Sequence, residues 1–190
     1  MDTQGHDAML QEPDRTEPTS EPTAAAPSSA PAAPPPRVSA LPPLPYMADA
    51  AQFGAFVHQQ LAECRRWSVP LAVLSLGIAN VQLAHDRHAA ALRTQLLQEA
   101  GLRLRSRVRA TDAVVRVGRD GFGLVLRDAT EATARNVEQR LTRALHMPYR
   151  IGSMLLSLTV QTGFAVYPQG GVTGEALVLA AERVRNKTGD

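Results

Sequence analysis

The sequence predicts a mixed α/β fold of the α+β kind, in which helices surround a central antiparallel β-sheet and a long disordered tail precedes the domain. Three observations predict it. Some segments repeat apolar residues at helical spacing, others alternate or run continuously over strand lengths, and proline is concentrated in the first 45 residues. After an opening helix the order is β-α-β-β-α-β, the split β-α-β plan in which two helices cover one face of the sheet. This plan hosts many functions, so it assigns none.

Residues 1–45 differ in composition from the rest of the chain. They hold 11 of the 14 prolines and six acidic residues against two basic ones, a net charge of −4, whereas residues 46–190 hold 18 basic and 12 acidic residues, a net charge of +6. With hardly any large apolar side chains, the first segment cannot offset the entropy lost on ordering. We therefore expect a disordered tail over 1–45 and one domain over 46–190. The tail fits a solubilising tether or a docking peptide for a protein partner.

Composition argues against several function classes. The first residues have neither the basic nor the apolar region of a signal peptide, and no apolar run reaches the length of a membrane span, so a cytoplasmic location is expected. Cys64 is the only cysteine and the five histidines show no ligand spacing, so no disulfide, metal or cofactor is expected. A diffuse basic excess with few aromatic residues does not favour nucleic acid. A homo-oligomer stays an open alternative.

The first half of the domain is predicted to hold two helices around a buried strand. Apolar residues at helical spacing indicate a helix over residues 50–67, in which Cys64 and Trp67 are expected to pack. The continuous apolar run over 71–78 is typical of a strand buried on both faces. An apolar face that recurs every four residues predicts a long helix over 92–108.

A β-hairpin follows. Residues 114–117 and 122–126 are apolar, β-prone runs on either side of a turn that contains Asp-Gly, a strong short-range hairpin signal. Phe122 is expected to anchor the core. The turn residues are Gly118, Arg119, Asp120 and Gly121.

Three more elements complete the chain. An amphipathic pattern predicts a helix over 134–145, alternation predicts a strand over 154–167, and residues 174–186 form the closing helix. The short segment 149–151 is a candidate partner of the strand. Together these elements give the split β-α-β order.

Order and spacing of these elements resemble the GGDEF domain, the diguanylate cyclase module that joins two GTP molecules into cyclic di-GMP. The family's Arg-x-Gly-Gly-Asp/Glu-Glu-Phe appears over residues 116–122 as Arg-Val-Gly-Arg-Asp-Gly-Phe, and its upstream Arg-x-x-Asp appears as Arg109-Ala-Thr-Asp112. Residues 160–168, Val-Gln-Thr-Gly-Phe-Ala-Val-Tyr-Pro, are similar to the family's V-x-x-G-x-A-x-x-P. The resemblance implies a GGDEF, nucleotide-cyclase-like fold for the core.

The positions that carry the family's chemistry differ here. In the family they hold metal ions, guanine or triphosphate, and in this chain they are Gly77, Ala79, His85, Thr94, Arg119 and Gly121. Phosphoryl transfer between two GTP molecules needs Mg²⁺ held by carboxylates. Asp120 alone survives in the turn, with Arg119 beside it as the expected partner of its charge. The resemblance therefore implies a degenerate domain without cyclase activity.

The residues that the family uses for product inhibition are present. In the family the Arg-x-x-Asp pair, here Arg109 and Asp112, binds cyclic di-GMP, and Arg140 matches a further arginine of that site. Guanidinium groups pair with phosphate or with guanine O6 and N7, and a carboxylate accepts from guanine N1 and N2. The structural alternative is that Arg109 complements a helix end and that Asp112 is an ordinary turn residue.

Two functions follow from these residues. The first is a catalytically inactive sensor that binds cyclic di-GMP at Arg109, Asp112 and Arg140 and regulates a partner machine, such as exopolysaccharide secretion or motility. The alternative is a nucleotide-independent scaffold that binds other proteins through its surface or its Pro-rich tail. An effect of cyclic di-GMP on the melting temperature would separate them.

Overall fold

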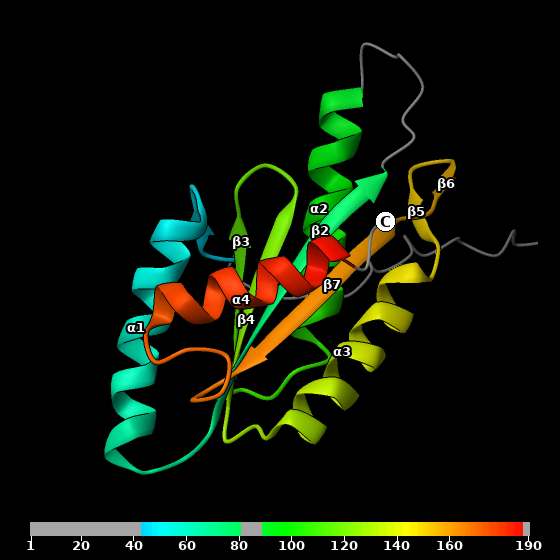
Figure 1. Ribbon diagram of the computed structural model, residues 1–190. Coiled ribbons are helices and arrows are strands. Elements are labelled where there is room, and N and C mark those ends of the chain that lie inside the picture. Colours follow the sequence, from blue (N-terminus) through cyan, green and yellow to red (C-terminus); the bar gives the residue numbers. More distant parts are fainter. Residues whose placement is uncertain (1–42, 81–88, 188–190) are drawn as a thin grey trace, which may run out of the picture. The chain divides into compact units, whose positions relative to one another are not determined.

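The structure, a computed structural model, describes residues 43–80 and 89–187. These residues form a five-stranded sheet of order β1-β3-β4-β2-β7 and a separate hairpin of β5 and β6. Figure 1 shows helices on both sides of the larger sheet. The expected tail lies outside the described residues as far as residue 42, and so does His85. Residues 43–45 were assigned to the tail, but Leu44 packs against the core, so they are part of the domain.

The element bounds follow the predicted ones closely. The helices are α1 (Ala50–Arg66), α2 (Ala89–Arg105), α3 (Glu131–His146) and α4 (Gly174–Lys187). The strands are β1 (Tyr46–Met47), β2 (Leu71–Asn80), β3 (Ala113–Val117), β4 (Gly121–Arg127), β5 (Tyr149–Ile151), β6 (Met154–Leu156) and β7 (Thr159–Val166). The order after α1 contains the predicted β-α-β-β-α-β, so the α+β fold class is confirmed. None of these helices is both long enough and apolar enough to cross a membrane.

β2 lies at the centre of the sheet. It pairs antiparallel with β4 on one side and with β7 on the other, and β3 pairs antiparallel with β4 to form the predicted hairpin. β1 was not anticipated from the sequence. It pairs parallel with β3 and places Met47 opposite Val117. In the described residues, β1 and β7 are therefore the two edges of the sheet.

Helices cover both faces of the sheet. α2 and α3 pack on one face over a core that includes Leu74, Leu76 and Phe122, while α1 and α4 pack on the other over Leu71 and Val73. The predicted plan has two helices on one face, and the structure adds a second pair on the opposite face. Successive residues of β2 are buried on alternate sides, which is why this strand is a continuous apolar run. Phe122 is 1% exposed, as expected for a core anchor.

α4 lies directly on β7 because Gly163 has no side chain. A Cβ atom at Gly163 would come within 2.2 Å of the Arg185 backbone nitrogen and 2.4 Å of the Ala181 carbonyl oxygen. These distances are far below van der Waals contact, so only glycine allows this approach. The close packing fixes where the side chains of α4 stand relative to β2.

Two local predictions are wrong. Trp67 was expected to pack, but it is 74% exposed, because α1 ends at Arg66 and the chain turns through Ser68, whose φ is 52°. The strand expected over 154–167 is interrupted, because β6 pairs with β5 while β7 pairs with β2. Cys64 does pack, at 2% exposure.

Candidate functional site

Arg109, Asp112 and Arg140 line one small cavity of about 160 Å³. Arg109 and Asp112 come from the loop between α2 and β3, and Arg140 comes from α3. Arg127, at the end of β4, also lines the cavity. We call this pocket, with these four residues, the arginine corner. The structure thus brings together the three residues singled out in the sequence and adds Arg127.

Asp112 holds the corner's backbone together. Its Oδ2 accepts a hydrogen bond from the Arg109 backbone N–H at 3.0 Å, and its Oδ1 accepts from the Arg127 backbone N–H at 3.4 Å. The carboxylate therefore joins the loop before β3 to the end of β4. Each carboxylate oxygen has two lone pairs, so both can accept a further bond from a ligand. Asp112 has a structural role, and that role leaves room for a binding role.

The arginines of the corner differ in how they are held. Arg140 donates from Nη2 to the Arg107 carbonyl oxygen at 2.8 Å, which ties α3 to the loop. Arg127 pairs with Glu63 of α1 at 2.7 Å. Arg109 is exposed, and its guanidinium has no hydrogen bond or ion pair to any residue in the described ranges. Arg109 is therefore the most available cation of the corner.

A second cavity lies at the opposite end of the β3–β4 hairpin. It has a volume of about 350 Å³ and is bounded by the hairpin turn, by Gly77 of β2 and by Arg185 of α4. We call it the turn pocket. Asp120 in the turn does not pair with Arg119, which is exposed, contrary to the sequence analysis. Arg93 of α2 holds it: its Nε donates to Asp120 Oδ1 at 2.7 Å, and Nη2 forms an ion pair with Oδ2.

Arg185 occupies the space over Gly77. A Cβ atom at Gly77 would lie 3.4 Å from Arg185 Cδ and 3.7 Å from its guanidinium carbon. Arg185 Nη1 donates to Ser75 Oγ at 2.8 Å, which fixes the guanidinium next to the strand. The resemblance makes Gly77 the position of a metal-holding carboxylate. In this chain a positive charge stands beside that position, and it would repel a divalent cation.

Three carboxylates line the turn pocket, and each already has a partner. Asp49 caps α1 by accepting from the Gln52 backbone N–H at 2.9 Å. Asp120 is held by Arg93, and Glu182 lies 3.8 Å from the Arg185 guanidinium. No group of three or more metal-ligating side chains is placed to hold an ion in the described part of the chain. The carboxylates of the turn pocket are therefore already engaged by other groups of the protein.

Sequence reasoning missed the arginines that control the turn pocket. Arg93 and Arg185 lie on helices, 27 and 65 residues away from Asp120, and no motif distinguishes them from other solvated arginines. Arg127 was missed for a different reason, since it closes a strand and lies outside the Arg-x-x-Asp motif. The only signal was general: a lone surviving carboxylate in a partly buried turn requires a cationic partner.

The ionisable groups with shifted pKa values lie outside both pockets. Burial raises the pKa of the Cys64 thiol, so this side chain stays protonated and packs in the core. Burial also raises the pKa of Tyr149, although the nearby Arg103 guanidinium opposes the shift. Arg103 lies 3.7 Å from the Tyr149 ring centroid and donates to the Ala144 and Met147 carbonyl oxygens. These contacts join α2 to the end of α3.

Comparison with known proteins gives consistent matches for most of the domain. A family model described as "Diguanylate cyclase, GGDEF domain" matches residues 46–188. MucR of Pseudomonas aeruginosa, a bifunctional diguanylate cyclase/cyclic di-GMP phosphodiesterase, is 29% identical over 126 residues, which is 66% of this chain and 18% of MucR. The cyclic di-GMP phosphodiesterase NbdA of the same species is 31% identical over 130 residues, which is 68% of this chain and 16% of NbdA.

The fold matches solved structures as well. The crystal structure of the GGDEF domain of TpbB, also called YfiN, from Pseudomonas aeruginosa superposes with a TM-score of 0.68 at 25% identity. The match covers 76% of this chain and 89% of that one. By contrast, the matched part of this chain spans less than a fifth of the length of MucR or NbdA.

Proposed function

The chain belongs to the GGDEF domain family of cyclic di-GMP signalling proteins, and from that premise we propose that its domain binds cyclic di-GMP at the arginine corner and does not synthesise it. The observation that carries the proposal is the single cavity lined by Arg109, Asp112 and Arg140. We place this sensor in the cytoplasm, where it regulates a protein partner such as a secretion or motility machine.

The corner offers the groups that cyclic di-GMP requires. Its guanidinium groups can donate to guanine O6 and N7 or to the two phosphates, and the Asp112 carboxylate can accept from guanine N1 and N2. Arg109 supports this role because it makes no side-chain bond within the described residues that a ligand would have to break. Arg140 is held by Arg107 beside the cavity, so it needs little reorganisation to donate.

The turn pocket supports the second half of the proposal. Joining two GTP molecules requires metal ions that neutralise phosphate charge. Here Gly77 provides no carboxylate, and Arg185 and Arg93 neutralise the acidic groups that remain. We expect purified protein with GTP and Mg²⁺ or Mn²⁺ to make no cyclic di-GMP. Product detected by mass spectrometry and abolished by Asp120→Ala would contradict this.

Calorimetric titration tests the binding site. Arg109→Ala removes a charge-assisted contact of about 1.5–3 kcal/mol, so we expect affinity for cyclic di-GMP to fall roughly ten- to a hundred-fold. Asp120→Ala is the matched control, because it removes an acidic residue of the hairpin at the other pocket and should change little. GTP should bind far more weakly than cyclic di-GMP. An affinity that does not respond to Arg109→Ala would exclude the corner as the site.

A nucleotide-independent scaffold is the second candidate. Exposed apolar side chains favour it, with Trp67 at 74%, Leu155 at 68% and Val172 at 60% exposure. Of these, tryptophan is the residue type enriched at protein interfaces. If wild-type protein shows no binding at high micromolar cyclic di-GMP, the scaffold is the function that remains.

A further inference from the structure

The outer edge of β7 is unpaired in the described part of the chain. β7 spans the eight residues Thr159–Val166, and β2 is its only partner among the strands that the structure describes. An uncapped edge strand presents a row of backbone N–H and C=O groups that can pair with another strand. Eight residues is long for an edge strand, since strands usually have about 5–6 residues. Figure 1 shows β7 running between α4 and α3.

The register identifies which backbone groups point outward. Tyr167 N–H donates to the Leu71 carbonyl at 2.8 Å, so odd-numbered residues of this strand direct their backbone groups toward β2. Backbone groups alternate along a strand, so those of Val160, Thr162, Phe164 and Val166 point away from the sheet. The Gly170 N–H donates to the Val166 carbonyl, which agrees with this direction and closes one end of the edge. Among the described residues, the open groups are therefore those of Val160, Thr162 and Phe164 and the Val166 N–H.

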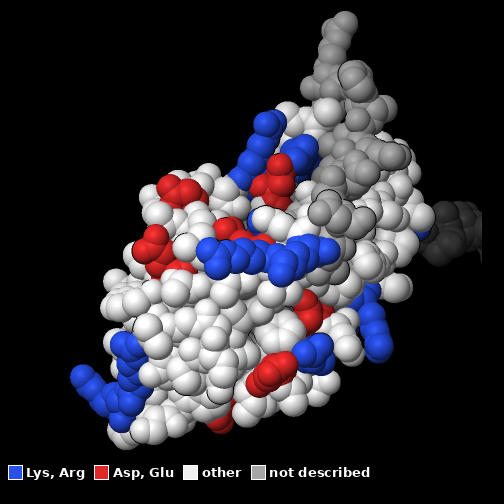
Figure 2. Space-filling model, viewed as in Figure 1, with Lys and Arg blue, Asp and Glu red and all other residues white. Residues whose placement is uncertain are grey.

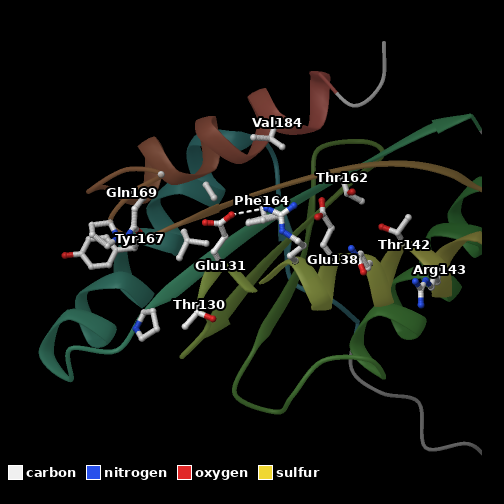
Figure 3. A pocket seen from close by; sticks show the side chains of 17 residues that line it. Thr130, Glu131, Glu138, Thr142, Arg143, Thr162, Phe164, Tyr167, Gln169 and Val184 are labelled. Atoms are coloured by element: carbon white, nitrogen blue, oxygen red, sulfur yellow. Dashed lines mark hydrogen bonds and ion pairs between the residues drawn. The ribbon is translucent and has the colours of Figure 1, made fainter. Parts of the chain in front are cut away.

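A groove of about 1060 Å³ runs along this edge. α3 provides one wall, where Arg135 pairs with Glu131 at 2.9 Å and lies 5.5 Å from the Phe164 ring centroid. Val184 of α4 contributes to the other wall. Figure 3 shows Glu131, Phe164 and Thr162 one after another from left to right along the groove, with Val184 above them. The volume is at the upper end of the roughly 300–1000 Å³ of small-molecule pockets, and the lining follows β7 from Thr162 to Val166, which suits an extended ligand.

The surroundings favour one kind of occupant. Figure 2 shows that this face is mostly uncharged, with basic and acidic side chains alternating in small groups. Glu131 and Glu138 balance Arg135 and Arg143 along the groove, so there is no net charge to attract a nucleic acid or an anionic lipid surface. A second copy fits less well than a single chain, because each copy's β7 lies between two helices and two such recessed edges would bring helix against helix.

We propose that the β7 groove binds an extended segment of a partner protein, which adds a sixth strand to the sheet. The segment has low net charge and apolar side chains at alternate positions, because its backbone pairs with Thr162 and Phe164 while one set of alternate side chains faces Val184 of α4. The side chains between them face the α3 wall, where Glu131 and Arg135 are charged. A segment of about seven residues would cover most of the eight-residue β7. The site is separate from the arginine corner, and its test does not depend on cyclic di-GMP.

Amide exchange measured by NMR on the full chain is the first test. With the edge open, the outward amides of Thr162 and Phe164 exchange at least about tenfold faster than the inward amides of Gly163 and Ala165. The probe is a pool of seven-residue peptides with valine, isoleucine or phenylalanine at alternate positions and threonine, lysine or glutamate between them. Adding the pool should slow the outward amides at least about tenfold. No slowing at millimolar total peptide overturns the proposal.

Backbone chemistry separates strand addition from simple apolar contact. Two versions of the best-binding peptide are made, each N-methylated at one set of alternate amides. N-methylation should abolish binding only when it is placed on the amides that face β7. If both versions of the peptide lose binding equally, strand pairing is overturned. The proposal is also overturned if the outward amides already exchange slowly without peptide. If their exchange rate then depends on protein concentration, a second copy covers the edge. If it does not, another part of this chain covers it.

Variants of the protein provide the matched pair. Thr162→Pro removes an outward N–H without removing a bond to β2, and should weaken peptide binding at least about tenfold, while Thr162→Val keeps the N–H and should bind like wild type. If the Gly163 and Ala165 amides of Thr162→Pro exchange faster than in wild type, the substitution has damaged the strand itself. Val184→Asp is then the test variant in its place. Val184→Asp places a charge in the wall and should also weaken binding about tenfold. If Val184→Asp and a folded Thr162→Pro variant both bind the peptide with wild-type affinity, the β7 groove is not the binding site.

Discussion

The arginine corner and the turn pocket lie at opposite ends of one hairpin, yet their charges are arranged in opposite ways. In the corner, the Arg109 guanidinium has no side-chain partner within the described ranges. In the turn pocket, Arg93 holds Asp120 with two bonds and Arg185 lies over Gly77. The corner therefore leaves one guanidinium without a partner among the described residues, whereas the turn pocket pairs its charges within the fold.

Under the proposed function, this difference means that one family scaffold keeps its ligand site while its catalytic site is lost. In the turn, Arg93 ties the Asp120 carboxylate to α2, while β3 and β4 are held together by their own backbone ladder. In the corner, Asp112 joins the loop before β3 to β4 by two hydrogen bonds. Its carboxylate oxygens keep further lone pairs that a ligand could contact. The following predictions test how independent the two ends are.

The largest effect is expected at Gly163, which lets α4 carry Arg185 into the turn pocket. Gly163→Ala places a methyl group 2.2 Å from the Arg185 backbone nitrogen, so α4 must move. We expect the free energy of unfolding to fall by about 3 kcal/mol, with binding of cyclic di-GMP at the corner unchanged in the folded protein. Chemical denaturation measures the first and calorimetry the second. Gly77→Ala is the control, because its methyl group would have ordinary contacts.

Asp112 should affect both stability and binding, which sharpens the comparison at the corner. Asp112→Ala leaves the Arg109 and Arg127 N–H groups without their acceptor, and we expect a loss of about 1–3 kcal/mol in stability. Asp112→Asn keeps a carbonyl oxygen and should recover most of that stability. It should still bind cyclic di-GMP at least about tenfold more weakly, because its charge is lost. Wild-type affinity in the Asn variant would show that the carboxylate is structural only.

Gly77→Asp tests whether a carboxylate at this position allows the turn pocket to bind a metal ion. The new carboxylate would stand next to the Arg185 guanidinium and pair with it. We expect a stability change of less than about 1 kcal/mol and no effect of Mg²⁺ on the melting temperature. A rise of several degrees with Mg²⁺, present in Gly77→Asp and absent from wild type, would show that Arg185 gives way to a metal ion.

The smallest effect is expected at Tyr149, which belongs to neither pocket. Its hydroxyl is buried without a hydrogen-bond partner in the described residues, so Tyr149→Phe should change stability at neutral pH by less than about 1 kcal/mol. Burial raises the pKa of Tyr149, so the unfolded chain ionises first. Wild-type protein should therefore lose stability as the pH rises above about 10, and the Phe variant should lose less. Urea denaturation at pH 7 and above pH 10 compares them.

The apolar periodicity and the turn residues were enough to predict most of the fold. They also predicted that Arg109, Asp112 and Arg140 lie close together. The Asp-Gly turn and its apolar flanks predict the hairpin, and the hairpin returns α3 to the end of α2, which brings Arg140 to Arg109. The helices could be located because each buries one periodic face. These predictions depend on backbone order and on apolar burial, both of which a single sequence carries.

The partners of the turn pocket could not be predicted in the same way. Arg119 is next to Asp120 in sequence, but the carboxylate pairs with Arg93, because the hairpin turn directs its acid toward α2. The position of Arg185 depends on how closely α4 approaches Gly163, a distance that no local pattern encodes. Trp67 and β1 were missed for a related reason, since both depend on where the chain turns rather than on its periodicity.

The entry of the chain into the domain has a mechanical consequence. The Pro45 carbonyl accepts from Arg116 N–H at 2.8 Å, and the Met47 carbonyl accepts from Gly118 N–H at 2.9 Å. A pulling force on the segment before residue 43 would therefore load β3 and the hairpin turn first, through a few backbone bonds, before it reached the helices. Because the two pockets lie at the ends of that hairpin, tension on the N-terminal side would be transmitted to the element that they share.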